Sequence, residues 1–263
     1  MRKVLNVGVI NINTVHPVYS SLEKTLGIIE KNKYSGLDIL MGPEWGLMNN
    51  NVANERPHSP AEFKDILAKI KDASRYSNTL IIPGTAVIHT KENKMYNILP
   101  VFYKGQVIFS TIKKADGGTS FFDINHNYEL IGKDYQIRNT FYWKGMKIGI
   151  EICADSDTLH EQGENNLNIQ ILSSSGVRNT TLAIKENGYL ICADGNRSAG
   201  RKVYVIRKST DQSDVNVFTY MDLLKSNDYT AISGAPFEFL PVEKKHQNMN
   251  VYRIEMELND DIP

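Results

Sequence analysis

Three residues that could act together in covalent chemistry each follow a strand-like segment of the sequence. Cys153 directly follows residues 146–152, Lys113 directly follows residues 106–112, and Glu44 comes shortly after a third apolar segment. In open α/β sheets the ends of different strands can converge on one crevice, so these three side chains can meet. A thiol, a carboxylate and an ammonium group supply the nucleophile, the proton acceptor and the cation that acyl transfer through a covalent intermediate requires.

Each of these residues also has an ordinary structural interpretation. An arbitrary free cysteine such as Cys153 is most often a small buried apolar residue. Glu44 could simply cap the turn that follows Pro43. Lys113 and Lys114 are adjacent, and side chains alternate along a strand, so only one of them can point into a site.

Strand-like and helix-like patterns alternate along the whole chain. Residues that are apolar on both faces, or that alternate, predict strands over 4–10, 37–41, 80–82, 95–103, 106–112, 146–152, 167–172, 189–193, 203–206 and 251–256. Helical spacing predicts helices over 18–29, from the capping box 59–62 onward, and over 179–188 with Gly188 as its stop. Lys104-Gly105 predicts a hairpin turn. Because no linker or repeat divides the pattern, it indicates one α/β domain over residues 1–263 with mixed sheets.

Composition excludes several classes of protein. The 263 residues contain 30 Lys+Arg and 30 Asp+Glu, and a zero net charge argues against a nucleic-acid partner. Two cysteines cannot make a disulfide framework, which fits a reducing compartment. Apolar runs such as residues 98–103 are too short to span a bilayer, and the N-terminus lacks a signal-peptide core. We therefore expect a cytoplasmic protein that binds neither membranes nor nucleic acids.

Common catalytic motifs are absent from the sequence. There is no G-x-S-x-G elbow and no C-x-x-C pair, and residues 160–164 lack the second histidine of a zinc-binding helix. Residues 195–202 resemble a phosphate-binding loop only loosely, because the lysine is displaced by one position and Val203 stands where Ser or Thr is needed. The Glu, Lys and Cys at the strand ends are the remaining candidates for chemistry.

In their order and separation these residues resemble the Glu–Lys–Cys set of the nitrilase, or carbon–nitrogen hydrolase, superfamily. The resemblance rests on Glu44 after Gly42-Pro43, on Lys113 at the end of residues 105–112, and on Cys153 within residues 149–155. Tyr96-Asn97 and Asn187-Gly188-Tyr189 resemble further family segments, so that nearly the whole chain is covered.

The resemblance implies a fold and a general activity. The fold would be a four-layer αββα sandwich, with two mixed sheets covered by helices. The protein would be a homodimer or a higher homo-oligomer. It would act on a small-molecule amide or nitrile substrate without a metal or other cofactor.

The residue types suggest a role for each member of the set. Cys153 would attack the substrate carbon and form a thioester, and Glu44 would accept and return the protons. Lys113, which the count from Gly105 favours over Lys114, would hold the oxyanion together with the backbone N–H of Ala154.

This sequence also departs from the family pattern. Many members carry a second glutamate before a glycine, here Gly132, and Glu129 is the only glutamate in that region. Asp123 and His126 are alternatives for this supporting role. Ser156-Asp157 and Ala154 replace an arginine and an aromatic residue that family members often have beside the nucleophile. We therefore expect an unusual acyl pocket.

Three further features have alternative interpretations. Cys192 stands where the resemblance expects an ordinary strand residue, so we interpret it as part of the core. Trp45 and Phe121-Phe122 could line an apolar pocket or pack in the core. Residues 173–176 could offer hydroxyl groups to a ligand or form a solvated turn.

The expected function is cysteine-dependent hydrolysis of a small amide or carbamoyl-type C–N bond, with release of ammonia or an amine. An alternative is a catalytically inactive protein of the same fold that binds a ligand or a partner. An acyl transferase and a nitrile-hydrolysing enzyme are variants that the residues do not distinguish from an amidase.

Overall fold

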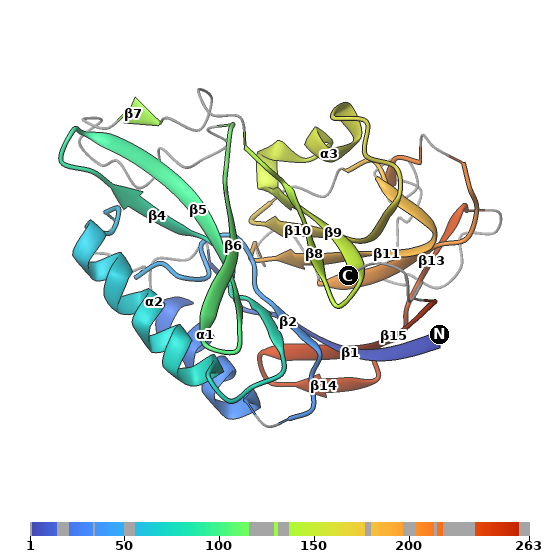
Figure 1. Cartoon of the computed structure of the whole chain (residues 1–263), viewed down its shortest axis with the longest axis horizontal. Helices are drawn as coiled ribbons and strands as arrows, with labels where there is room; N and C mark the ends of the chain where they lie inside the picture. The colour runs from blue at the N-terminus through green and yellow to red at the C-terminus, as the bar shows by residue number, and fades with distance from the viewer. Residues whose placement is uncertain are drawn as a thin grey trace.

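The chain folds into an α/β structure in which two mixed sheets pack face to face (Figure 1). The computed structural model describes residues 2–14, 21–33, 35–49, 56–115, 129–130, 137–176, 180–196, 203–212, 215–217 and 235–257. The helices are α1 (Ser21–Asn32), α2 (Pro60–Ser74), α3 (Thr158–Glu161) and the short 3₁₀ helix η3 (Cys153–Asp155). No helix within these ranges is long and apolar enough to cross a membrane.

Sheet A has nine strands in the described part of the chain. Its main path runs β14-β15-β1-β2-β3-β5-β4, and β6 and β7 also pair with β5. The central neighbours β1, β2 and β3 are parallel, and antiparallel strands flank them on both sides. The strands are β1 (Arg2–Ile10), β2 (Ile39–Met41), β3 (Leu80–Ile82), β4 (Ala86–His89), β5 (Lys94–Tyr103), β6 (Gln106–Ile112), β7 (Glu129–Leu130), β14 (Lys244–His246) and β15 (Met249–Glu257).

Sheet B has six strands among the residues described, in the order β13-β12-β11-β10-β9-β8. The central neighbours β9, β10 and β11 are parallel, and the flanking pairs are antiparallel. The strands are β8 (Thr140–Trp143), β9 (Met146–Ile152), β10 (Leu167–Ser174), β11 (Ile184–Asp194), β12 (Tyr204–Lys208) and β13 (Phe237–Phe239). Each sheet therefore has a parallel centre whose strands all end at the same edge.

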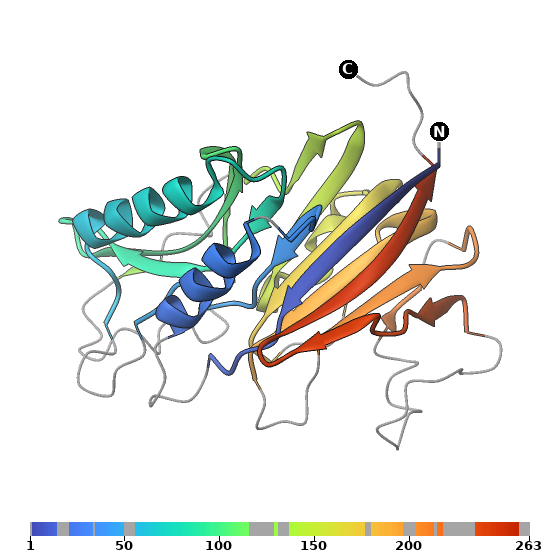
Figure 2. The ribbon, with the colours of Figure 1, turned by 90° about the horizontal axis from the view of Figure 1, so that it is seen from below.

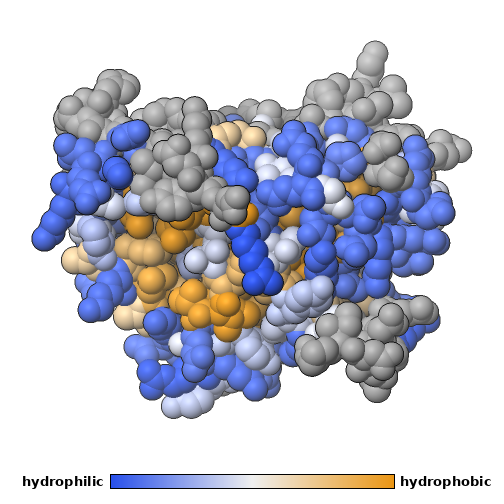
Figure 3. Space-filling model, turned by 45° about the horizontal axis from the view of Figure 1, so that its top comes forward, coloured by the Kyte–Doolittle hydropathy of each residue, from blue (hydrophilic) through white to orange (hydrophobic). Residues whose placement is uncertain are grey.

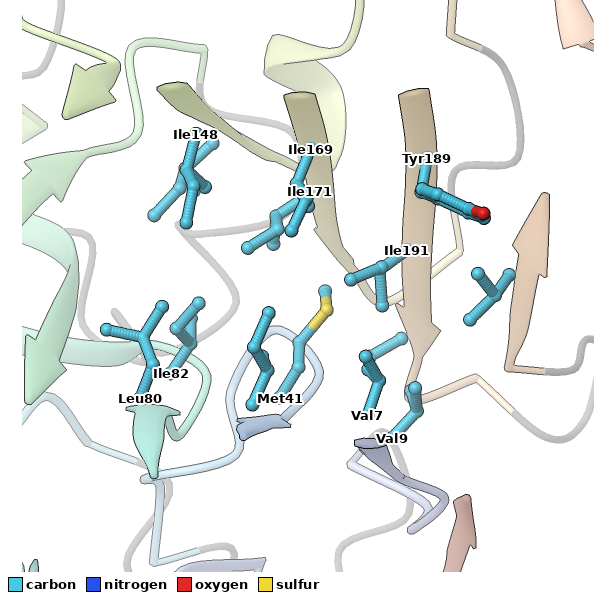
Figure 4. Packing of buried hydrophobic residues seen from close by; sticks show 14 of the residues in the cluster. Val7, Val9, Met41, Leu80, Ile82, Ile148, Ile169, Ile171, Tyr189 and Ile191 are labelled. Carbon is cyan, nitrogen blue, oxygen red and sulfur yellow. The ribbon is translucent and has the colours of Figure 1, made fainter. Parts of the chain in front are cut away.

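Apolar side chains from the inner faces of both sheets form the core between them. Figure 4 shows Val7 and Met41 from sheet A facing Ile169, Ile171 and Ile191 from sheet B, and all five are fully buried. Burying one such side chain contributes about 1.5–3 kcal/mol, so this layer supplies much of the driving force for folding. The same strands are covered on their outer faces too, which explains their nearly continuous apolar runs.

The outer face of each sheet has its own cover. Helices α1 and α2 lie against sheet A (Figure 2) and pack buried residues such as Ile29, Phe63 and Ile70 onto it. On sheet B the described residues place α3 and two extended segments, 180–184 and 215–217, over the outer face. The layering confirms the expected α/β fold with two mixed sheets.

Local signals in the sequence explain where several elements begin and turn. Ser59 caps α2 by accepting the backbone N–H of Glu62 at 3.3 Å, and the Glu62 carboxylate accepts the N–H of Ser59 at 2.7 Å. Lys104 and Gly105 join β5 to β6 with φ values of 49° and 76°, as a two-residue turn between twisted strands requires. Both the capping box and the hairpin are confirmed.

The helix predicted over residues 179–188 is wrong where the structure describes it. The backbone N–H groups of Leu182 and Ala183 donate to Val215 O at 2.8 Å and to Gln170 Oε1 at 2.9 Å, so the chain is extended and makes no helical bonds there. Residues 185–188 then form an irregular part of β11, where Asn187 has a φ of 60°. The apolar spacing that suggested a helix instead reflects burial of consecutive residues under sheet B.

Two edge strands close one side of the sandwich. Phe109 of β6 stacks on Phe141 of β8 with ring centroids 4.7 Å apart. Val107, Ile108 and Tyr142 are among the exposed large apolar residues of these strands. Figure 3 shows one face of the molecule, on which an apolar area lies among mainly hydrophilic residues.

Backbone segments cross closely just after β2 and β3. Gly84 has a φ of 94°, and a Cβ atom at this position would collide with the carbonyl oxygen of Pro43. Such a conformation and such a contact both require glycine. The crossing fixes the course of the chain immediately before Glu44.

We expect Gly84→Ala to lower the free energy of unfolding by about 2–4 kcal/mol, because it adds overpacking against rigid backbone to an unfavourable φ. Gly27→Ala is the matched control, since a Cβ there meets nothing within 4 Å in the middle of α1 and should stabilise the protein by about 0.5–1 kcal/mol. Denaturant unfolding of both variants checks this. A Gly84→Ala variant as stable as the wild type would contradict the crossing.

Candidate active site

The strand ends of the two sheets meet at one edge of the sandwich. The backbone N–H of Glu44, just beyond β2, donates to Ser174 O at the end of β10 at 3.3 Å. The N–H of Thr14, beyond β1, donates to Gly195 O beyond β11 at 2.9 Å. Residues that follow parallel strands of different sheets are thereby held against each other, as the sequence pattern predicted.

Glu44 and Lys113 form a fully buried ion pair at this edge. Both side chains are 0% exposed, and Lys113 Nζ lies 2.6 Å from Glu44 Oε1. Asn97 of β5 donates from Nδ2 to the same oxygen at 2.9 Å, and its carbonyl accepts the backbone N–H of Lys113 at 2.8 Å. Asn97 therefore holds both members of the pair.

The electrostatics of Glu44 are dominated by its burial. Burial raises the pKa of the Glu44 carboxyl above its usual range. The charge of Lys113 and hydrogen bonds from Lys113, Cys153 and Asn97 oppose that shift by favouring the ionised form. A carboxyl group whose pKa is raised in this way exchanges protons at a higher pH than a solvated glutamate does.

Cys153 lies beside this pair at the start of η3. Its side chain is buried, and the thiol is within hydrogen-bonding reach of Glu44 and of the backbone N–H of Ser175. Burial and then the negative charge of Glu44 raise the pKa of the Cys153 thiol to about 12, against the opposing effects of Lys113 and the Ser175 N–H. The resting thiol is therefore protonated and next to a carboxylate that can accept its proton.

The backbone is strained at two of the strand ends that build the site. Cys153 has a φ of 47°, and Trp45, directly after Glu44, has a φ of 61°. Residues other than glycine seldom adopt such angles unless the surrounding structure imposes them. Thr85 helps to do so by accepting the Trp45 N–H on its hydroxyl oxygen at 2.9 Å.

The remaining predicted site residues lie in varied settings. Ala154 follows Cys153 in η3, and its side chain is exposed. Glu129 occupies an exposed position on β7, opposite Lys94 in the parallel pairing of β7 with β5. Its supporting role stays a prediction. Asp123, His126, Gly132 and Phe121-Phe122 lie outside the described residues.

The alternatives left open for other residues can be compared with their surroundings. Trp45 belongs to the apolar cluster between sheet A and its helices, and Cys192 belongs to the cluster outside sheet B, so both pack in the core. Ser173 and Ser174 are buried, and the Ser173 hydroxyl donates to Gly42 O at 3.1 Å. These two serines thus tie the sheets together and do not form a solvated turn.

Sequence reasoning missed several residues that build the site. Asn97 contacts Glu44, and the backbone N–H of Ser175 lies beside the Cys153 thiol. Both arrangements bring together segments that are distant in the sequence. The resemblance of Tyr96-Asn97 to a family segment was the only signal for Asn97. Nothing in the local sequence pointed to Asp155, whose carboxylate accepts two backbone N–H groups beyond Lys113.

A polar cavity of about 560 Å³ lies elsewhere and contains none of these residues. It is lined by charged side chains near the other end of the strands, among them Arg2, Lys185, Arg207, Glu238 and Glu255. Most of these charges are paired with each other, as Arg2 is with Glu255 and Arg207 with Glu238. The described residues also contain no cluster of His, Cys, Asp or Glu that could hold a metal ion.

Glu151 is a second buried carboxyl group close to the turn that carries Cys153. It lies two residues before Cys153 and accepts the Leu159 N–H at 3.0 Å, Gln170 Nε2–H at 2.9 Å and the Thr180 hydroxyl at 2.8 Å. Burial, opposed by these hydrogen bonds, raises its pKa to about 7. Its contacts with α3 and β10 anchor the segment that follows Cys153.

The Glu151 pKa predicts a pH-dependent stability. Because the folded-state pKa exceeds the unfolded value, the stabilisation is complete below about pH 4.5 and is lost as the pH rises through about 7. Relative to Glu151→Gln, the wild type should lose roughly 3 kcal/mol of unfolding free energy across that window. Glu92→Gln, at an exposed turn, is the control. The free energy of unfolding is measured with denaturant at a series of pH values. If it changes with pH in the same way in the wild type and in Glu151→Gln, the prediction is contradicted.

Comparisons with known proteins rest on structure. No family model matches the chain, and no curated protein sequence matches it. A double mutant of the amidase from Nesterenkonia sp. AN1, in complex with acrylamide, has a TM-score of 0.57 at 8% identity over 97% of this chain and 91% of that one. Nit3 from Saccharomyces cerevisiae, a member of branch 10 of the nitrilase superfamily, has a TM-score of 0.54 at 12% identity over 86% of this chain and 96% of that one.

Part of a larger protein has a similar fold. The glutamine-dependent NAD+ synthetase from Acinetobacter baumannii has a TM-score of 0.51 at 18% identity, and the match covers 67% of this chain and 33% of that one. The chain therefore spans about a third of the length of that relative. Two mixed sheets packed face to face, together with these matches across most of the chain, show that the chain has the fold of the nitrilase superfamily.

Proposed function

We propose that the protein is a cysteine-dependent hydrolase of a small amide or carbamoyl-type C–N bond, which it cleaves through a thioester. The observation that carries the proposal is the position of Glu44. Its buried carboxylate lies 2.6 Å from Lys113 Nζ and close enough to Cys153 for its charge to raise the pKa of the thiol. A thiol and a cation are thus gathered around one carboxylate that can accept a proton, away from bulk water.

In the first half of the reaction, the Cys153 sulfur attacks the substrate carbonyl carbon while Glu44 accepts the thiol proton. The new C–S bond gives a tetrahedral intermediate, and its oxyanion is stabilised by Lys113 and the backbone N–H of Ala154. Glu44 then donates the proton to the substrate nitrogen as the C–N bond breaks. Ammonia or an amine leaves, and the acyl group remains on Cys153 as a thioester.

In the second half, water replaces the departed amine. Glu44 removes a proton from this water, whose oxygen attacks the thioester carbon. The C–S bond then breaks, the carboxylic acid is released, and the proton on Glu44 returns to the Cys153 sulfur. One carboxyl group thus serves both half-reactions, and positioned proton transfer of this kind contributes roughly 10²–10⁴ in rate.

The shared fold supports this proposal, because one protein of that fold is an amidase whose double mutant binds acrylamide. The exposure of Glu129 favours a second candidate, a protein that binds an amide-like ligand without turnover. In that case the pair and the thiol would recognise a polar ligand, and no ammonia would be released. The two candidates differ in a single measurable property, which is turnover that depends on Cys153.

The two cysteines provide a matched test of the nucleophile. We expect Cys153→Ala to lower ammonia release from a panel of small amides by at least about 1000-fold, because the thioester can no longer form. Cys192→Ala shortens a side chain in the apolar cluster on the outer face of sheet B. The folded variant should therefore retain the wild-type kcat. Equal ammonia release by wild type and Cys153→Ala would end the proposal. Added nucleophilic amines would show whether the acyl group passes to an amine instead of water.

The pH profile tests the role of Glu44. Glu44 must be ionised to accept the thiol proton, so kcat/KM should fall as the pH decreases through a pKa above 4.5. Asn97→Ala removes a hydrogen bond to the ionised carboxylate and should move this acid limb to higher pH by about one unit. Asn168→Ala, whose side chain accepts the Lys147 N–H, is the control. An acid limb that stays in place in Asn97→Ala would argue against Glu44 as the base.

A further inference from the structure

Asp155 connects the turn that carries Cys153 to the strand end that carries Lys113. It lies two residues after Cys153 in η3 and is only 6% exposed. Its Oδ2 accepts the backbone N–H of Lys114, and its Oδ1 accepts that of Ala115, both at 2.7 Å. Both carboxylate oxygens are thus directed at the two residues that follow Lys113.

These bonds fix the backbone of Lys113 from the side that β5 does not reach. On the other side, the N–H of Lys113 donates to Asn97 O at 2.8 Å, which ends the pairing of β6 with β5. The strand end is therefore held by β5 before Lys113 and by η3 after it. With its backbone fixed at both points, Lys113 places Nζ 2.6 Å from Glu44.

The charge of Asp155 suits this arrangement. Burial raises the pKa of the Asp155 carboxyl, whereas the two N–H groups and the nearby charges of Lys113 and Lys114 favour its ionised form. Hydrogen bonds from N–H groups to a carboxylate are shorter and stronger than those to a neutral acceptor. An amide side chain has a single acceptor oxygen, so Asn at this position can keep only one of the two bonds.

We propose that Asp155 is a positioning residue that sets where Lys113 lies relative to Cys153. The inference rests on the proposed function, in which Lys113 receives the oxyanion formed at Cys153. A displacement of about 1 Å in a group that acts on the reacting atoms can cost about 100-fold in rate. Asp155 does not itself touch the substrate, so its effect on chemistry must pass through Lys113.

A double-mutant cycle tests this route. The readout is the rate of Cys153 alkylation by iodoacetamide, followed by peptide mass analysis with Cys192 as the internal reference. We expect Asp155→Asn to slow alkylation of Cys153 by about tenfold in the wild-type background and by less than about twofold in the Lys113→Met background, where the positioned group is already gone. Thermal unfolding confirms that each variant is folded, and Lys113→Gln, which also removes the ammonium group, provides a second background if Lys113→Met is not.

Asp38→Asn is the matched control. The Asp38 carboxylate also accepts a backbone N–H, that of Asn6 at 3.0 Å, but it does so near the opposite end of the sheet A strands. The Asp38→Asn substitution should leave the Cys153 alkylation rate within about twofold of the wild-type rate. A merely structural contribution of a buried carboxylate would not depend on the presence of Lys113.

Two results would overturn the inference. One is an equal slowing by Asp155→Asn with and without Lys113, and the other is an unchanged alkylation rate in folded Asp155→Asn. Ammonia release is measured separately on the same proteins. If it does not depend on Cys153, the proposed function fails, while the alkylation cycle still decides whether Asp155 acts through Lys113.

Discussion

A fully buried ion pair sets the conditions that the surrounding structure has to meet. Moving Glu44 and Lys113 out of water costs several kcal/mol per charge, and attraction at 2.6 Å offsets this only with added hydrogen bonds such as that from Asn97. The thiol of Cys153 shares the same environment, and its raised pKa keeps it protonated. In the proposed mechanism, burial thereby links the three groups into one unit for proton transfer.

The two-sheet architecture supplies that environment. Strands β2 and β6 of sheet A and β9 of sheet B end at the same edge, and each delivers one of the three side chains. Rigid contacts then remove the remaining freedom, because Gly84 lets the backbone pass close to Pro43 and Asp155 holds the chain beyond Lys113. Sites built on strand ends with such support are held more precisely than sites on free loops.

The sequence allowed the strand ends to be predicted but not the contacts between them. Apolar runs, the capping box at Ser59 and the Lys104-Gly105 turn are local signals, and each led to the right element. The bonds of Asp155 to residues about 40 positions away, and of Asn97 to Glu44, arise from tertiary packing that no local pattern encodes. The same limit produced the wrong helix over 179–188, where burial beneath sheet B imitated a helical pattern.

Formation of a thioester at Cys153 tests the central claim most directly. Wild-type protein mixed with p-nitrophenyl acetate should release a burst of about one p-nitrophenolate per chain and carry an acetyl group on the peptide that contains Cys153. Cys153→Ala should give neither the burst nor that adduct. Acetylation of Cys192 or of lysines without a burst would contradict the account.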